Sequence, residues 1–164
     1  MFPDHLIIDG NNLIHLAKGK FLAGTRDFAA ARRSLATQID ELAGGLAGKV
    51  TIVFDGTIGG RDDSFKVANL DIIYSESHVT ADRIIERMVS SSREPAKILV
   101  VTSDRSERHT VEAAGGEVTS CSVFVEMMED SKKALKSGMK KLQQQSKGPT
   151  LGDFFPEVTN RGKK

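Results

Sequence analysis

The sequence predicts an α/β fold in three layers, with a mostly parallel sheet between two layers of helices. Short unbroken apolar runs are the first observation, because such runs are typical of strands buried on both faces of a parallel sheet. Segments with helical spacing of apolar residues lie between them, which is the alternation expected of parallel strands joined by crossover helices. The three main runs, each ending in an aspartate, are Leu6–Asp9, Val50–Asp55 and Ile98–Asp104.

The N-terminal third of the chain supplies one strand and two helices. A strand is expected at His5–Asp9, followed by a helix at Asn12–Phe21. Asp27 has the short polar side chain that favours a helix N-cap, and apolar residues then recur at helical spacing from Phe28 to about Ala47. These segments therefore predict one strand, one short helix and one long helix.

The middle of the chain begins with a second strand at Val50–Phe54. We interpret the following segment, Gly56–Lys66, as an irregular loop because it is rich in glycine and charge. A short strand at Asp71–Tyr74 comes next, and Thr80 is expected to cap a helix from Ala81 to about Ser91. The remaining predicted elements are a strand at Lys97–Thr102, a helix from Arg105 to Ala114, a strand at Glu117–Thr119 and a helix that starts at Ser122.

Composition indicates a globular cytoplasmic protein. The chain has 164 residues, of which 39% are hydrophobic and 27% charged, so it is long enough to bury a core. Its apolar runs are far shorter than the roughly 20 residues that cross a membrane, and its N-terminal segment does not resemble a secretory signal. With a single cysteine, Cys121, no internal disulfide is expected.

Charge is distributed unevenly along the chain. Residues 1–130 hold 14 Lys and Arg against 20 Asp and Glu, whereas residues 131–164 hold 9 against 2. This difference suggests one domain at 1–130 and a basic C-terminal helix and tail at 131–164. The basic segment either meets a polyanion or is a solvated helix with a frayed end.

Four aspartates are the candidate functional residues: Asp9, Asp55, Asp82 and Asp104. Three of them follow predicted parallel strands, whose carboxyl ends share one edge of the sheet, and Asp82 lies in the first turn of a helix. Gathered carboxylates repel one another unless a cation neutralises them. Oxygen ligands suit Mg²⁺ or Mn²⁺, and no Cys/His set for zinc is present. This chemistry favours metal-assisted attack of water on a phosphodiester.

Each aspartate also has a purely structural alternative. Asp9 and Asp55 both precede glycine and could serve turns. Asp82 could be a surface residue favoured by the helix dipole, and Asp104 could be the N-cap of the helix that follows it. The sequence leaves these alternatives open.

Other polar residues are candidates for substrate binding. Asn12 could orient Asp9 or a phosphate, or cap a helix, and Ser103 could bind a phosphate near a helix N-terminus or serve a turn. Arg61 and Lys66 of the predicted loop could contact phosphates or be solvated.

Two residues near Asp82 could support the acids. Thr80 is the expected N-cap of the same helix. Glu86 lies one turn after Asp82 on the same helix face, where it either supports the site or pairs with Arg83 or Arg87.

Four short motifs, taken in their order along the chain, resemble those of the YacP-like NYN domains of the PIN-like nuclease superfamily. The matching segments, which span about residues 6–128, are Asp9-Gly-Asn-Asn12, Val53-Phe54-Asp55, Thr80-Ala81-Asp82 with Ile85-Glu86, and Val101-Thr102-Ser103-Asp104. The resemblance implies a PIN-like α/β/α sandwich and a Mg²⁺- or Mn²⁺-dependent ribonuclease.

The resemblance also implies roles for individual residues. Asp9, Asp82 and Asp104 match the family's acidic site, and Asp55 matches an accessory acid. Ser122 and Glu126 match a serine and a glutamate that open the last domain helix. The chain departs from the family at two positions, where Asn11 replaces a common aromatic residue and Arg108 replaces a common glutamine.

The leading hypothesis is therefore a metal-dependent endoribonuclease that acts in RNA decay or processing. The alternative is a non-catalytic RNA- or ribosome-binding module with the same fold. A small-molecule phosphatase is disfavoured, because the first strand lacks an Asp-x-Asp pair and no phosphate-binding Gly-x-x-x-x-Gly-Lys loop is present. The RNA that is cut, whether it is mRNA on the ribosome, the number of metal ions and the oligomeric state are not defined by the sequence.

Overall fold

A six-stranded sheet forms the centre of the fold in the computed structural model, which describes residues 2–17, 27–56, 58–61 and 69–145. The strand order is β3-β4-β2-β1-β5-β6. All neighbours pair in parallel except β3, which runs antiparallel to β4. The strands are β1 (His5–Asp9), β2 (Lys49–Phe54), β3 (Ile58–Arg61), β4 (Leu70–Glu76), β5 (Ile98–Val101) and β6 (Glu117–Thr119).

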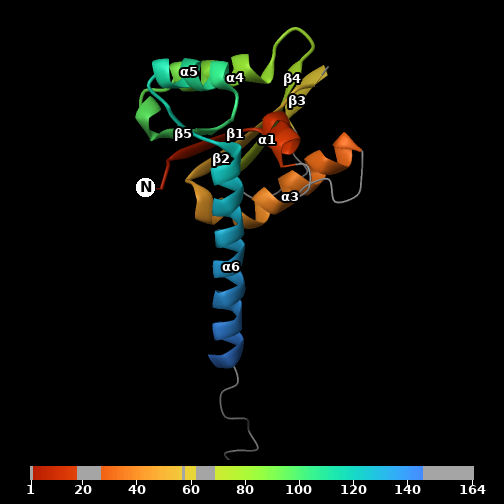
Figure 1. Cartoon of the computed structure of the whole chain (residues 1–164), viewed down its shortest axis with the longest axis vertical. Helices are drawn as coiled ribbons and strands as arrows, with labels where there is room; N and C mark the ends of the chain where they lie inside the picture. The colour runs from red at the N-terminus through yellow and green to blue at the C-terminus, as the bar shows by residue number, and fades with distance from the viewer. Residues whose placement is uncertain (1, 18–26, 57, 62–68, 146–164) are drawn as a thin grey trace, which may run out of the picture. The chain divides into compact units, whose positions relative to one another are not determined.

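Helices cover both faces of this sheet, as Figure 1 shows for α3 on one side and for α4 and α5 on the other. The predicted three-layer α/β/α sandwich with a mostly parallel sheet is therefore confirmed. The helices are α1 (Gly10–Leu16), α3 (Phe28–Leu46), α4 (Ala81–Ser90), α5 (Arg105–Ala113) and α6 (Cys121–Gln145), with a short 3₁₀ helix, η1 (Pro95–Lys97).

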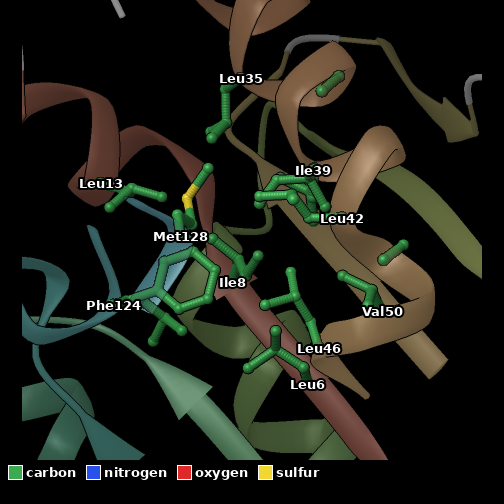
Figure 2. Close-up of a cluster of buried hydrophobic side chains, with 14 of the residues drawn as sticks. Leu6, Ile8, Leu13, Leu35, Ile39, Leu42, Leu46, Val50, Phe124 and Met128 are labelled. Atoms are coloured by element: carbon green, nitrogen blue, oxygen red, sulfur yellow. The ribbon is translucent and has the colours of Figure 1, made fainter. Parts of the chain in front are cut away.

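The alternation of side chains along β1 separates two cores. Leu6 and Ile8 point to the face covered by α1, α3 and the start of α6, where Figure 2 shows Ile8 beside Phe124 and Met128. Ile7 points to the opposite face and joins the core of α4 and α5, together with Ile85. Because side chains alternate along a strand, Asp9 points to the same face as Ile7. The last residue of β1 is thereby directed toward α4 and α5.

One predicted element is wrong. The segment interpreted as an irregular loop contains β3, which pairs with β4 through Ile58 opposite Glu76 and Gly60 opposite Tyr74. Gly59 and Gly60 have φ angles of +79° and +117°, a region that other residues rarely adopt. Two adjacent glycines are typical of a turn, which favours the interpretation as a loop. The short edge strand also lacks the alternating apolar pattern that would reveal it.

Helix bounds differ slightly from the prediction. The first helix begins at Gly10 rather than Asn12, because Asp9 itself is the N-cap. The predicted end of this helix lies outside the described residues, as does Lys66. Asp27 and Thr80 cap α3 and α4 as predicted, and each side chain accepts a hydrogen bond from the first turn of its helix.

The chain divides into two compact units, Met1–Glu129 and Asp130–Lys164. The sheet, the helices from α1 to α5, the start of α6 and all of the candidate acids belong to the first unit. Within the described ranges, no helix is both long and apolar enough to cross a membrane.

Candidate metal centre

Asp9 ends β1 at the carboxyl edge of the sheet and is only 5% exposed. Its Oδ1 accepts a hydrogen bond from the amide N–H of Asn12 at 3.1 Å, which caps α1. The carboxylate is therefore held by the start of the helix that follows it. Its direction is set by the pleat of the strand, which turns it toward α4 and α5.

Two further carboxyl groups meet Asp9 at this edge. Asp82 lies in the first turn of α4, and Glu107 lies in the first turn of α5. One carboxylate oxygen from each of the three residues lies within 4.8 Å of the others. Asp9 and Glu107 are buried, whereas Asp82 is exposed, so the acid cluster of Asp9, Asp82 and Glu107 opens to solvent at Asp82.

Glu107 was not among the residues predicted from the sequence. It is 4% exposed, and its Oε2 accepts a hydrogen bond from the hydroxyl of Thr102 at 2.6 Å. Its Oε1 is buried and receives no N–H or hydroxyl donor among the described residues. The side chain also forms a hydrogen bond with the carboxyl group of Asp9, which requires a proton on one of the two groups. A buried carboxylate oxygen without a donor is costly, and a cation would satisfy it.

The electrostatics of the cluster favour protonated carboxyl groups. Burial, followed by the charge of Asp9, raises the pKa of Glu107 to about 9. Burial also raises the pKa of Asp9, and the charges of Asp82 and Asp55 add to that effect. Burial and then the charge of Asp104 raise the pKa of Asp82. Without a cation the three groups therefore cannot all ionise readily near neutral pH.

Asp104 lies close enough to affect Asp82 electrostatically, but it is outside the acid cluster. It is the N-cap of α5, where its Oδ1 accepts hydrogen bonds from the amides of Ser106 and Glu107 at 2.8 and 3.1 Å. The structural alternative considered for Asp104 is thus present in the structure. By starting α5 at this point, Asp104 also fixes where Glu107 faces.

Asp55 follows β2 and joins the sheet to α4. Its Oδ1 accepts a hydrogen bond from the amide of Ala81 at 2.9 Å, and its Oδ2 accepts one from the side chain of Asn11 at 3.2 Å. Arg32 of α3 donates to the backbone carbonyl of Asp55 at 2.8 Å. Asp55 therefore anchors the first turn of α4, from which Asp82 reaches the acid cluster, and is itself outside that cluster.

Asn12 and Ser103 connect three elements beside the cluster. The side-chain carbonyl of Asn12 accepts hydrogen bonds from the amide of Ser103 at 2.8 Å and from the thiol of Cys121 at 3.2 Å. The hydroxyl of Ser103 accepts a hydrogen bond from the amide of Cys121 at 3.0 Å. The predicted candidates Asn12 and Ser103 thus tie α1, the loop after β5 and α6 together next to Asp9.

A polar cleft of about 230 Å³ lies between α4 and α5. Asp82 and Glu107 line it together with Thr80, Glu86 and Arg83. Thr80 and Glu86, the predicted supporting residues, are therefore next to the cluster. Arg61 ends β3 and is exposed, and nothing described places it in this cleft.

A pattern in α5 could have revealed Glu107. It occupies a position of the buried helix face, four residues before Val111 and seven before Ala114, which also pack inward. Polar residues at such positions are buried and need a partner or a function. The predicted acids were chosen because they end strands, and that criterion does not select a residue inside a helix.

The donor set fits a hard divalent cation. Three carboxyl groups within reach of one ion, one of them with a buried oxygen that no N–H or hydroxyl group reaches, match the oxygen ligands that Mg²⁺ and Mn²⁺ prefer. The side chains come from the ends of one strand and two helices, so the fold holds them in position before any ion binds.

Comparisons with known proteins agree with this fold. The model of the YacP-like NYN domain family matches residues 6–160, beyond the last of the motifs recognised in the sequence. The crystal structure of Rae1 (YacP) from Bacillus subtilis superposes with a TM-score of 0.73 at 21% identity, covering 87% of this chain and 83% of that chain. A mutant of the same protein gives a TM-score of 0.71 at 22% identity, with 86% and 84% covered. A search of curated proteins gave no match.

Proposed function

Because this chain belongs to the YacP-like NYN domain family, which is of the nuclease type, we propose that it is a Mg²⁺- or Mn²⁺-dependent endoribonuclease. The observation that carries this proposal is the convergence of Asp9, Asp82 and Glu107, with oxygens within 4.8 Å of one another. The three residues are far apart in the sequence, and only the fold brings them together. The substrate would be RNA, and the reaction would be hydrolysis of a phosphodiester bond.

The acid cluster would hold the cation, with Asp104 near its edge. When bound, the cation offsets charge that develops on phosphate oxygens and favours deprotonation of water. Asp9 and Glu107 are buried, so they suit the role of fixed ligands. Asp82 is exposed and lines the open cleft, so its carboxylate is the one that can orient the attacking water.

Other residues of this chain would position the site and the RNA. Asp55 holds the start of α4, and Asn12 and Ser103 fix the loop beside Asp9. Arg83 lines the cleft next to Asp82 and would contact a phosphate. Arg61, Lys66 and the basic segment 131–164 would hold the RNA backbone by charge, so binding should weaken steeply as salt rises.

Cleavage of a labelled RNA by the purified full chain tests the proposal. Activity should require Mg²⁺ or Mn²⁺ and stop in excess EDTA. Asp82→Asn should abolish cleavage and leave the circular dichroism spectrum unchanged, since Asp82 is exposed and caps nothing. Glu112→Gln is the matched control, because Glu112 is exposed on α5 and outside the cleft.

Two outcomes would overturn this proposal. Cleavage that persists in excess EDTA would exclude a divalent cation from the reaction. An RNA affinity that does not change when Mg²⁺ is added, without cleavage of any RNA tested, would favour the non-catalytic RNA- or ribosome-binding module instead.

A further inference from the structure

A second pocket is lined by Ser103 and Cys121, which both donate hydrogen bonds to Asn12, and its chemistry differs from that of the acid cluster. Its volume is about 410 Å³, and Leu16, Ala17 and Val125 supply apolar walls. Cys121, which is buried, also lines it. A pocket of this size can hold one planar ring system, and aliphatic side chains can pack against its faces.

Hydrogen bonds connect this pocket to the acid cluster. Ser103 lines the pocket, and its backbone N–H donates to the side-chain oxygen of Asn12. The backbone N–H of Asn12 in turn donates to the carboxylate of Asp9. Burial raises the pKa of the Cys121 thiol, and the charges of Asp9 and Glu107 raise it further, so the pocket wall is within electrostatic reach of the cluster. A group bound in the pocket would therefore lie beside a phosphate held at the acids.

Glu126 gives this pocket a specific polar feature. It lines the pocket together with Ser122, one turn before it on α6. Among the described residues, no Lys, Arg or His forms an ion pair with Glu126. An ionised carboxylate only accepts hydrogen bonds, and it repels the phosphates of RNA. Glu126 is exposed and so can be reached by a ligand, and a ligand group that contacts it must offer hydrogen-bond donors.

We propose that this pocket binds one nucleobase of the RNA and that Glu126 selects guanine over uracil. Single-stranded RNA is recognised by bases that leave the stack and expose their Watson–Crick edges. Guanine offers two neighbouring donors on that edge, its ring N–H and its amino group, which match the two oxygens of a carboxylate. Uracil offers one N–H between two carbonyls, which would face the carboxylate unfavourably.

This inference rests on the proposed ribonuclease function for its substrate class, but a binding measurement can test it separately. Guanosine and uridine monophosphate would be titrated into the ¹⁵N-labelled full chain in Mg²⁺ and followed by the amide signals of Ser122 and Val125. The phosphate is common to both ligands, so the ratio of affinities reports the base. A bidentate contact predicts at least about tenfold tighter binding of the guanosine nucleotide.

The matched variants are Glu126→Gln and Glu112→Gln. The first should lower the affinity for guanosine monophosphate about tenfold, because guanine loses the second carboxylate oxygen. It should raise, and not lower, the affinity for uridine monophosphate, because the glutamine amide donates to a uracil carbonyl that the carboxylate repels. The second should change neither. Equal affinities in the wild type, or a guanine preference that survives Glu126→Gln, would overturn the inference.

Cleavage of a randomised RNA library, with the ends mapped by sequencing, gives the second readout. Guanine should be enriched at one position next to the cut, and Glu126→Gln should remove that enrichment while cleavage continues. Cleavage without any base preference would overturn the base pocket and leave the nuclease intact. Selective binding of the guanosine nucleotide without cleavage of any RNA would overturn the nuclease and leave the pocket intact.

Discussion

The carboxyl groups of Asp9 and Glu107 face each other at the carboxyl edge of the sheet, one from the end of β1 and one from the first turn of α5. Both side chains are buried, and they form a hydrogen bond with each other when one of them is protonated. Two buried carboxylates at this distance repel each other strongly unless a proton or a cation lies between them. The pair therefore links the stability, the protonation and the metal affinity of this protein.

Glu107→Gln should reduce metal affinity and cleavage together. The change keeps the size of the side chain and removes its charge, so the fold should persist while a ligand is lost. Removing a residue that only hydrogen-bonds to a metal ligand typically lowers metal affinity by about 10–100-fold. Loss of a direct ligand should lower it by more than that. Titration of Mn²⁺ followed by calorimetry checks the affinity, with Glu112→Gln as the control. Unchanged Mn²⁺ affinity would show that Glu107 is not a ligand.

The metal-free protein should lose stability as pH rises from about 5 to about 9. The pKa of Glu107 is about 9 in the folded state and 4.5 ordinarily, so over this range the folded state retains a proton that the unfolded state has lost. The free energy of unfolding then falls with pH, by at most about 1.4 kcal/mol per pH unit for one proton. The raised pKa values of Asp9 and Asp82 act in the same direction.

Urea unfolding in EDTA at several pH values checks this dependence. Saturating Mg²⁺ should flatten it, because the cation binds the ionised carboxylates and its binding releases protons. Glu107→Gln should flatten it without metal. A stability that rises with pH over this range in EDTA would contradict the account of the pair.

Asp55 should act by positioning α4. Asp55→Ala removes the acceptor for the amide of Ala81 and should cost about 1 kcal/mol of stability, as loss of a helix cap does. Cleavage should fall as Asp82 loses its fixed position. Asp55→Asn keeps an acceptor oxygen and should retain most of the activity. Thermal unfolding and cleavage rates of both variants check this, and an inactive but fully stable Asp55→Asn would instead make Asp55 a direct ligand.

Gly10 should be intolerant of a side chain. It follows Asp9 directly, and a Cβ at this position would overlap the buried ring of Phe54 and crowd Ile52. Gly10→Ala should therefore lower the free energy of unfolding by about 1–3 kcal/mol, the usual cost of overpacking. Gly45→Ala is the control, because a Cβ there meets nothing within 4 Å in α3. Chemical denaturation compares the two, and equal stabilities would contradict the packing seen at Gly10.

Much of the site could be predicted because strand ends follow from the apolar pattern. A buried parallel strand must end where its apolar run ends, so Asp9 was placed correctly at the edge of the sheet. Glu107 was missed because its burial depends on which face of α5 packs on the sheet. The face of α5 that turns inward is set by tertiary contacts of Val111 and its neighbours.

The roles of Asp55 and Asp104 depended on backbone donors that the sequence does not display. Each of them accepts amide hydrogen bonds at the start of a helix, and an aspartate before a helix satisfies both a capping and a metal-binding pattern. The strand β3 was missed for a related reason. Its pairing is made by the backbone of a glycine-rich segment against β4, without an apolar side-chain pattern.

The most direct test is the anomalous scattering of a crystal of the full chain soaked in Mn²⁺. The account predicts a peak within coordinating distance, about 2.0–2.3 Å, of oxygens from Asp9, Asp82 and Glu107. Absence of Mn²⁺ from this cluster in crystals whose cluster is open to solvent, or a peak held only by other residues, would contradict it.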